Sequence, residues 1–189
     1  MMKLSTFSWS LVFLCAGFCC PGEDDYIEPP TYSIEAPELI EIKDSSTSYA
    51  LNDTIWIKTE VPVNLEHNGE VLNISEVAGN SDRLYAYLDL YQQTGFENPT
   101  LLSLSPDEVI SREGEVSTSS ALIATAFLNG QNFQSEFGIV LKQPGEFFVS
   151  SYYQQPLNLY VDSNNGVLVY LLTTFKNSDE PDLFRFTVE

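Results

Sequence analysis

The stretch Leu84-Tyr-Ala-Tyr-Leu-Asp-Leu-Tyr91 alternates strictly between aliphatic side chains and tyrosine or aspartate. Successive side chains of a β-strand point to opposite faces of its sheet, so this period of two predicts a strand with one buried face. The leucines and Ala86 share the face expected in the core. Tyr85, Tyr87 and Tyr91 share the opposite face, towards solvent or towards a covering segment.

Eight further segments show the same alternation or a comparable run of β-branched and aromatic residues. Dipeptides such as Asn68-Gly69 and Asn129-Gly130 separate them and supply residues that tolerate the positive φ of hairpin turns. Ser105-Pro-Asp-Glu108 has the capping pattern of a helix start, which predicts one short helix near 106–112. The nine expected strands span 39–43, 54–61, 84–91, 121–128, 133–141, 146–153, 157–161, 167–175 and 183–188.

About nine short strands separated by turns predict an all-β domain with two antiparallel sheets or a barrel. Two stretches favour the sandwich. Residues 137–149, from Phe137 through Pro144-Gly145 to Val149, resemble the strand–corner–strand of the C-terminal half of immunoglobulin-like domains. Asn52-Asp-Thr-Ile-Trp-Ile57 resembles an early strand of such domains in uncharacterised Bacteroidota lipoproteins. The resemblance implies an immunoglobulin-like antiparallel β-sandwich of about nine strands and brings no catalytic residues with it.

The N-terminus has the layout of an export signal. Lys3 precedes an uncharged apolar run that ends at Cys20, slightly short for a helix that spans a membrane. All three cysteines, Cys15, Cys19 and Cys20, lie in this run and none follows it. Alternative interpretations are a retained membrane anchor and an ordinary cleaved signal without lipid.

This arrangement resembles the signals of bacterial lipoproteins, which implies a lipid attached to Cys20, with Cys19 as the alternative. The acidic residues Glu23, Asp24 and Asp25 follow directly and resemble the export tag of Bacteroidota surface lipoproteins. The resemblance implies a lipid-anchored protein of the outer membrane, exposed at the cell surface. We therefore expect a signal peptide at 1–20, an acidic and Pro-rich tether at 21–37 and the β-sandwich at 38–189.

The charge of the chain limits its partners. It has 27 acidic and 8 basic residues, a formal net charge of −19. Binding to nucleic acid needs a basic surface, so a nucleic-acid partner is excluded, and docking on anionic lipid by charge is disfavoured. The expected partners are the lipid leaflet through acyl chains, and an outer-membrane protein complex or a glycan.

Signals for catalysis and metal binding are weak. His67 is the one histidine and falls at an expected hairpin tip, so neither a zinc site nor a cofactor is predicted. Asp162-Ser-Asn-Asn-Gly166 begins like a calcium loop but lacks the later glutamate, and a type I′ Asn-Gly hairpin explains it more simply. We expect a protein that is not an enzyme. The alternative is an envelope carbohydrate-active enzyme that uses paired carboxylates.

Exposed aromatic residues give the strongest binding signal. Trp56, Tyr85, Tyr87 and Tyr91 are candidate contacts for a ligand or a protein partner, because aromatic surfaces with polar tips suit both. Cross-strand packing of aromatic residues is the simpler interpretation of the same pattern. The sequence thus predicts a non-catalytic surface lipoprotein that acts as an accessory or interaction module, with a glycan as one candidate ligand.

Overall fold

The structure is a computed structural model that describes residues 28–95, 98–119 and 121–189. Along these residues it contains seventeen strands, one short α-helix and two 3₁₀ turns, which confirms an all-β protein. The strands are β1 (Thr31–Glu35), β2 (Ile40–Lys43), β3 (Ser48–Tyr49), β4 (Thr54–Pro62), β5 (Asn64–His67), β6 (Glu70–Asn73), β7 (Arg83–Gln93), β8 (Thr100–Leu101), β9 (Val109–Glu113), β10 (Glu115–Ser117), β11 (Leu122–Asn129), β12 (Asn132–Val140), β13 (Gly145–Ser151), β14 (Asn158–Val161), β15 (Leu168–Leu172), β16 (Phe175–Lys176) and β17 (Leu183–Val188). The helical turns are α1 (Ile74–Val77), η1 (Pro106–Glu108) and η2 (Tyr152–Gln154).

Strand β7 is the centre of the main sheet, whose order is β1-β15-β14-β7-β11-β12-β4-β2-β16. Its eleven residues are long enough to pair with two strands along each edge. One edge pairs with β11 and β8, and the other pairs with β14 and then with β13. The sheet is mixed, because β1–β15, β16–β2 and β17–β3 are parallel pairs. Strands β5 and β6 form a separate hairpin.

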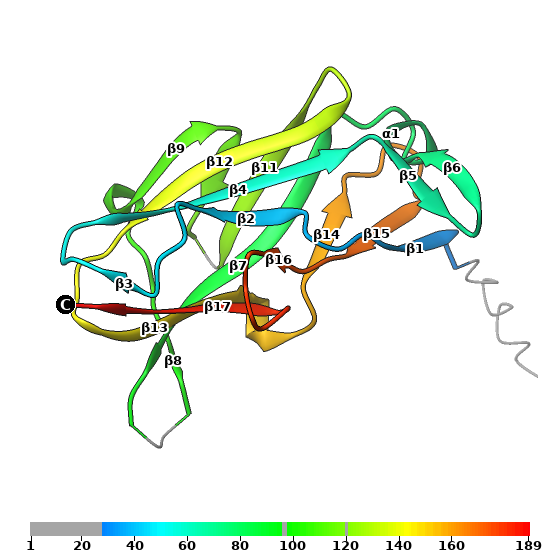
Figure 1. The fold of residues 1–189 in the computed structure, drawn as a ribbon. Coiled ribbons are helices and arrows are strands. Elements are labelled where there is room, and N and C mark those ends of the chain that lie inside the picture. The colour runs from blue at the N-terminus through cyan, green and yellow to red at the C-terminus, as the bar shows by residue number, and fades with distance from the viewer. Residues whose placement is uncertain (1–27, 96–97, 120) are drawn as a thin grey trace, which may run out of the picture.

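The sheet curls so that the part containing β2, β4 and β12 lies over the part containing β13, β14 and β17 (Figure 1). Both parts press their aliphatic faces on one core. The alternation expected for β7 is confirmed, since Leu84, Ala86, Leu88 and Leu90 are all buried. A core shared between two layers of one curled sheet explains why long strands such as β4, β11 and β12 bury every second side chain.

Several predictions about the elements are wrong. The strands number seventeen rather than about nine, because short edge strands such as β3, β8 and β10 carry too few residues to show an alternating pattern. The helix expected near 106–112 is only the turn η1, after which Val109 continues as the strand β9. Residues 31–35, expected in the tether, form β1 and pair with β15, so the folded domain begins before residue 38.

The conformation of one of two Asn-Gly turns follows from the local sequence alone. Asn68 and Gly69 both have positive φ and close the β5–β6 hairpin, as expected for a type I′ turn. The expected type I′ turn at Asn165-Gly166 is wrong, because only Gly166 has positive φ there. Asn165 instead donates from Nδ2 to the carbonyl of Val77 (3.0 Å), which holds the β14–β15 loop against α1.

A splayed hairpin accounts for the position of β9 and β10. Strands β11 and β12 pair only near their shared turn, and then β10 continues the pairing on β11 while β9 pairs with β12. Gly114 joins β9 to β10 in the opening between them. A Cβ at Gly114 would lie 2.3 Å from the carbonyl oxygen of Thr125 and 2.9 Å from the Cβ of Ser135, so a side chain does not fit there.

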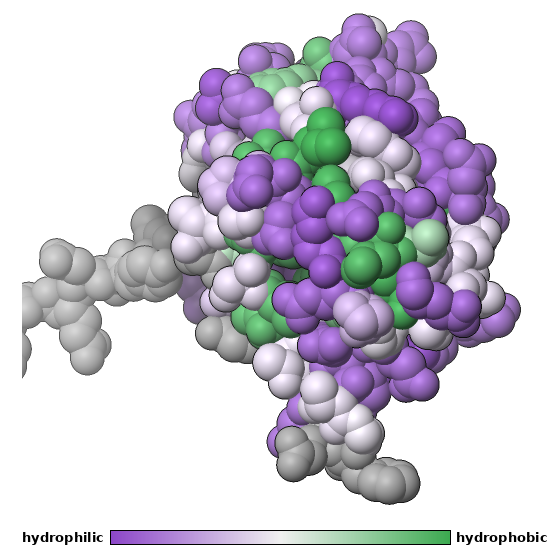
Figure 2. Space-filling view, turned by 90° about the vertical axis from the view of Figure 1, so that its left-hand side faces the viewer, coloured by the Kyte–Doolittle hydropathy of each residue, from purple (hydrophilic) through white to green (hydrophobic). Residues whose placement is uncertain are grey.

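The surface agrees with the composition. Figure 2 shows one end of the molecule, where hydrophilic side chains cover most of the surface and hydrophobic ones gather in a few small areas. Among the described residues, no helix is long and apolar enough to cross a membrane.

Candidate functional site: a tyrosine row beside an open hollow

Four tyrosines from three neighbouring strands lie together on the outer face of the sheet. Tyr160 of β14 is the cross-strand partner of Tyr85 on β7 and of Tyr170 on β15. The ring of Tyr160 meets that of Tyr87 at 90° (centroids 5.4 Å apart) and that of Tyr170 at 80° (4.9 Å). All four are half-buried. We call Tyr85, Tyr87, Tyr160 and Tyr170 the tyrosine row.

Two phenol groups of the row, those of Tyr85 and Tyr160, are held in their neutral form, because their pKa values are raised. Burial raises the pKa of Tyr160, and the neighbouring phenols of Tyr170 and Tyr87 raise it further. Burial likewise raises the pKa of Tyr85, and the charge of Asp162 adds to the effect. The hydroxyl of Tyr85 donates to Oδ2 of Asp162 (3.3 Å), so this tyrosine is tied to the loop after β14.

The row borders a hollow that exists because two strands share one edge of β7. Strand β13 pairs with β7 up to Ser151, opposite Leu88, and β14 takes over at Leu159, opposite Ala86. The chain between them turns away from the sheet through η2. It leaves an open hollow of about 350 Å³. The lining residues are Tyr87, Ser151, Tyr152, Gln155, Pro156, Asn158 and Tyr160.

Hydrogen bonds within the lining fix its polar groups. The hydroxyl of Ser151 donates to the carbonyl oxygen of Gln155, which closes the η2 turn. Nδ2 of Asn158 donates to the carbonyl of Pro156 (2.9 Å), while its Oδ1 is buried and accepts no hydrogen bond from the described residues. The hollow therefore has aromatic walls, and the donors of Ser151 and Asn158 are used within its own lining.

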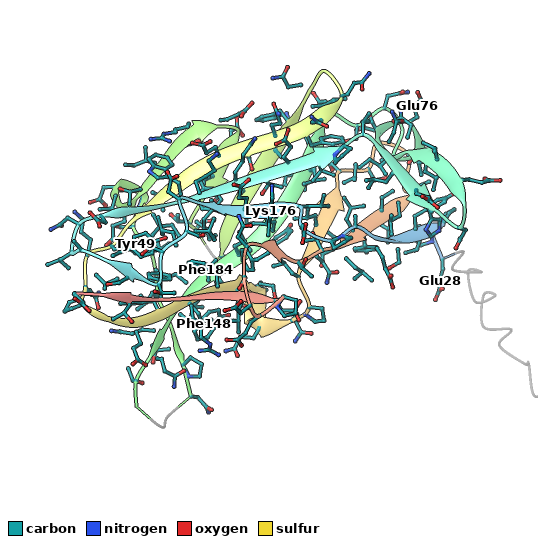
Figure 3. All side chains as sticks on the ribbon, viewed as in Figure 1. Glu28, Tyr49, Glu76, Phe148, Lys176 and Phe184 are labelled. Carbon is teal, nitrogen blue, oxygen red and sulfur yellow. The ribbon has the colours of Figure 1, made fainter. Side chains whose placement is uncertain are left out.

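Tyr91 lies away from the row although it shares a strand face with Tyr85 and Tyr87. It is only 4% exposed and stacks on Phe148 of β13, with ring centroids 5.0 Å apart and planes 12° apart. Its hydroxyl donates to Oδ2 of Asp89 (3.4 Å). Phe148, labelled in Figure 3, also lies beneath the guanidinium of Arg185 (5.2 Å). The structure thus places Tyr91 in a packed aromatic pair.

Trp56 lies on β4, which β11 and β12 separate from β7 in the sheet order. Its indole is half-buried and extends over Gly138, its cross-strand partner on β12. Because glycine has no side chain, the indole reaches the guanidinium of Arg112 on β9, 3.3 Å from the ring centre. Of the four predicted aromatic contacts, only Tyr85 and Tyr87 are brought together.

The expected lipid site lies outside the described residues, as do Cys19, Cys20, Glu23, Asp24 and Asp25. The first described residue, Glu28, lies at one end of the molecule, and the C-terminus lies near the other end (Figures 1 and 3). Strand β1 follows at once and is two strands from β14 in the sheet order.

The described residues assemble no catalytic constellation. Five of the hollows along the described residues each have at most one carboxylate in their lining. His67 ends β5 with its ring edge-on to that of Tyr32 (6.2 Å). Within the described ranges, no group of three His, Cys, Asp or Glu side chains could hold a metal ion.

Sequence reasoning missed most of the lining. Alternation in Asn158-Leu-Tyr-Val161 does place Tyr160 opposite two buried aliphatic residues, and this signal could have added it to the candidates. The pairing of β14 with β7 could not have been predicted, because neither segment carries a sequence pattern that specifies its partner strand.

Comparisons with known proteins leave the family open. The sequence matches no family model and no curated protein. Among solved structures, the human F-spondin reeler domain is similar over 86% of this chain and 96% of its own, with 5% sequence identity and a TM-score of 0.37. At that TM-score the likeness carries no argument about fold or function.

Proposed function

We propose that the chain is a non-catalytic cell-surface lipoprotein whose β domain is an interaction module that binds a glycan in the hollow beside the tyrosine row. The observation that carries this proposal is the hollow itself, where Tyr87, Tyr152 and Tyr160 line one open space. Aromatic rings with hydroxyl tips bind the apolar faces and polar edges of sugars. The volume lies at the lower end of the range for small-ligand pockets.

The location belongs to the same proposal. An acylated Cys20, with Cys19 as the alternative, anchors the protein in the outer membrane, and Glu23, Asp24 and Asp25 direct it to the cell surface. More than one acyl chain anchors a protein stably, whereas one chain holds it only marginally. Because β1 begins at Thr31, the tether between lipid and domain is short, and the hollow lies within reach of glycans of the surrounding envelope.

An immunoglobulin-like arrangement is the finer description of the fold that we propose. The single core between two layers of the curled sheet is consistent with a β-sandwich. A module of this kind can also bind to an outer-membrane protein complex as an accessory subunit. None of the five hollows described above holds the pair of carboxylates that the enzyme alternative requires.

A glycan array tests the binding half of the proposal. The full chain should bind a subset of glycans, and Tyr87→Ala and Tyr160→Ala should each weaken binding about tenfold or more, as the loss of a stacked aromatic contact does. Tyr32→Ala, which removes a half-buried tyrosine of β1 beside His67, is the matched control and should bind normally. Binding that survives both row variants would refute the assignment of the hollow.

Metabolic labelling with a fatty-acid analogue tests the anchor. We expect label in the wild type and in Cys19→Ala, and none in Cys20→Ala. The opposite result would move the attachment to Cys19, and no label in any form would refute the lipoprotein proposal. Protease added to intact cells should digest the domain. Protection until lysis would place it on the inner face.

A further inference from the structure

We infer that the hollow beside the tyrosine row selects ligands that carry an organic cation, either a quaternary ammonium group or the protonated amine of an amino sugar. This inference rests on the proposed function, because it names the ligand class of the same hollow. Three features of the lining point to it: the three tyrosine rings, the use of two hydrogen-bond donors within the lining, and the absence of a cationic side chain from the lining.

Ring geometry gives the first argument. The rings of Tyr87 and Tyr160 meet edge to face at 90°, with centroids 5.4 Å apart, and Tyr87, Tyr152 and Tyr160 all line the same space. The face of an aromatic ring is negative and its edge positive. A cation within about 6 Å of a ring centroid is attracted to that face, and walls of several rings recognise methylated ammonium groups.

Hydrogen bonding gives the second argument. The donors of Ser151 and Asn158 are consumed within the lining by the carbonyls of Gln155 and Pro156. Oδ1 of Asn158 accepts no hydrogen bond from the described residues. That oxygen is also out of contact with solvent, so a ligand in the hollow does not reach it. The ligand meets a lining in which two donors are already used, and this disfavours an anion.

Charge gives the third argument. None of the described residues that line the hollow is charged. The carboxylate of Asp162 lies on the same outer face, held by Tyr85, and the whole chain has a formal net charge of −19. Such a field concentrates cations at the surface and repels anions. A uronic or sialic acid would meet this field with no cationic residue in the lining to offset it.

The test compares ligands of one shape with and without charge. The full chain is purified in a polyoxyethylene detergent, which carries neither ammonium nor sugar, and binding is followed by calorimetry and saturation-transfer NMR. Choline is compared with 3,3-dimethylbutan-1-ol, its uncharged isostere, and glucosamine with glucose, which has a hydroxyl in place of the amine. The cation of each pair should bind about twofold to thirtyfold tighter, the range that cation–π contacts give. A response to choline or to glucosamine alone identifies the quaternary ammonium or the amino sugar as the source of the cation.

Variants tie the charge preference to the rings. Tyr160→Phe keeps the aromatic ring and should keep the preference for the cation. Tyr160→Leu removes the ring and should abolish that preference. Tyr87→Leu is the second variant should Tyr160→Leu fail to fold, and Tyr32→Leu is the control.

Equal binding of cation and isostere, or a preference that survives both leucine variants, would overturn the inference. Neutral sugars that bind in a manner dependent on Tyr87 and Tyr160 would overturn it while leaving the proposed function intact. Failure of every sugar and cation to bind would overturn both.

Discussion

The guanidinium of Arg112 lies 3.3 Å from the centre of the Trp56 indole, across the strand β12 that separates their own strands β9 and β4. Nη1 of Arg112 also donates to Oε1 of Glu136 (2.8 Å). The contact depends on Gly138, the cross-strand partner of Trp56, over which the indole extends. The indole of Trp56, which the sequence pattern predicted to be exposed, is therefore covered by the guanidinium of Arg112 from another strand.

Loss of Arg112 should uncover the indole. In a chain that starts at residue 21, Trp56 is the single tryptophan, so its fluorescence reports on this contact alone. Arg112→Ala should shift the emission to the red and lower the free energy of unfolding by about 0.5–1.5 kcal/mol, the worth of an exposed cation–π contact plus a surface ion pair. Arg185→Ala is the matched control, because Arg185 is similarly exposed and paired with Glu180 but lies over Phe148. An unshifted emission in Arg112→Ala would contradict the stacking.

A side chain at Gly138 should be costly although its φ is negative. A Cβ there would lie 2.5 Å from Cγ2 of Thr54 and 3.0 Å from the indole ring of Trp56. We expect Gly138→Ala to lower the free energy of unfolding by about 1–3 kcal/mol, as overpacking does. Thr54→Ser removes the nearer contact, so the cost of Gly138→Ala should fall in the double variant, measured by urea unfolding. Equal costs in the two backgrounds would show that the clash is elsewhere.

The tyrosine row should make the protein sensitive to alkali. Because the pKa of Tyr160 is raised above its ordinary 10.0, the neutral phenol stabilises the fold fully below that pH, and the contribution disappears as the pH rises through the higher folded-state pKa. Tyr160→Phe should therefore lose less stability than wild type between about pH 9 and about pH 11, either side of the ordinary tyrosine pKa. Urea midpoints measure this. Tyr32→Phe controls for the loss of one phenol, and a wild-type response in Tyr160→Phe would contradict the assignment.

The loop between β14 and β15 should depend on one amide. Asn165 donates from Nδ2 to the carbonyl of Val77 (3.0 Å) and accepts at Oδ1 from the backbone N–H of Val167 (3.1 Å). Asn165→Ala should lower the free energy of unfolding by about 1–2 kcal/mol, since these two hydrogen bonds and a longer one from the hydroxyl of Ser163 (3.3 Å) are lost. Asn164→Ala removes a longer contact to Gly79 (3.4 Å) and should cost less. The unfolding temperature should not respond to calcium, and a rise of several degrees would revive the calcium-loop interpretation.

Replacing His67 should leave function intact. Its ring lies at the β5–β6 hairpin, edge-on to Tyr32, and Nε2 meets the Asn68 amide at 3.0 Å. We expect His67→Ala to change stability by less than about 1 kcal/mol, as surface substitutions usually do. Ligand binding should be unchanged. If His67→Ala abolished binding or an activity while the far-ultraviolet circular dichroism stayed native, an enzymatic role would have to be reconsidered.

Alternation of buried and exposed residues predicted the strands well where the alternating segment was long. The segments around Leu84, Ile55 and Phe137 carry a buried residue at every second position, because one face of each strand packs on the core. Two- and three-residue strands such as β3 and β10 carry no such pattern. They pair because the long strands beside them present free backbone groups.

The candidate site was predictable only in part. The period of two put Tyr85 and Tyr87 on the outer face of β7, and the structure agrees. The same period grouped Tyr91 with them, yet Phe148 of β13 covers it. The hollow needs β13 and β14 to share an edge of β7, a pairing between segments more than fifty residues apart along the chain.

The sequence by itself determined an all-β chain, the buried face of each long strand, the tight turn at Asn68-Gly69 and a strongly acidic surface, because each follows from residues next to one another or from composition. Only the tertiary structure decided which tyrosines gather, that Trp56 reaches Arg112 over Gly138, and that a hollow opens between β13 and β14. The physical reason is that strand pairing satisfies backbone hydrogen bonds that every segment offers alike, so neighbours are chosen by how all the faces pack on one core.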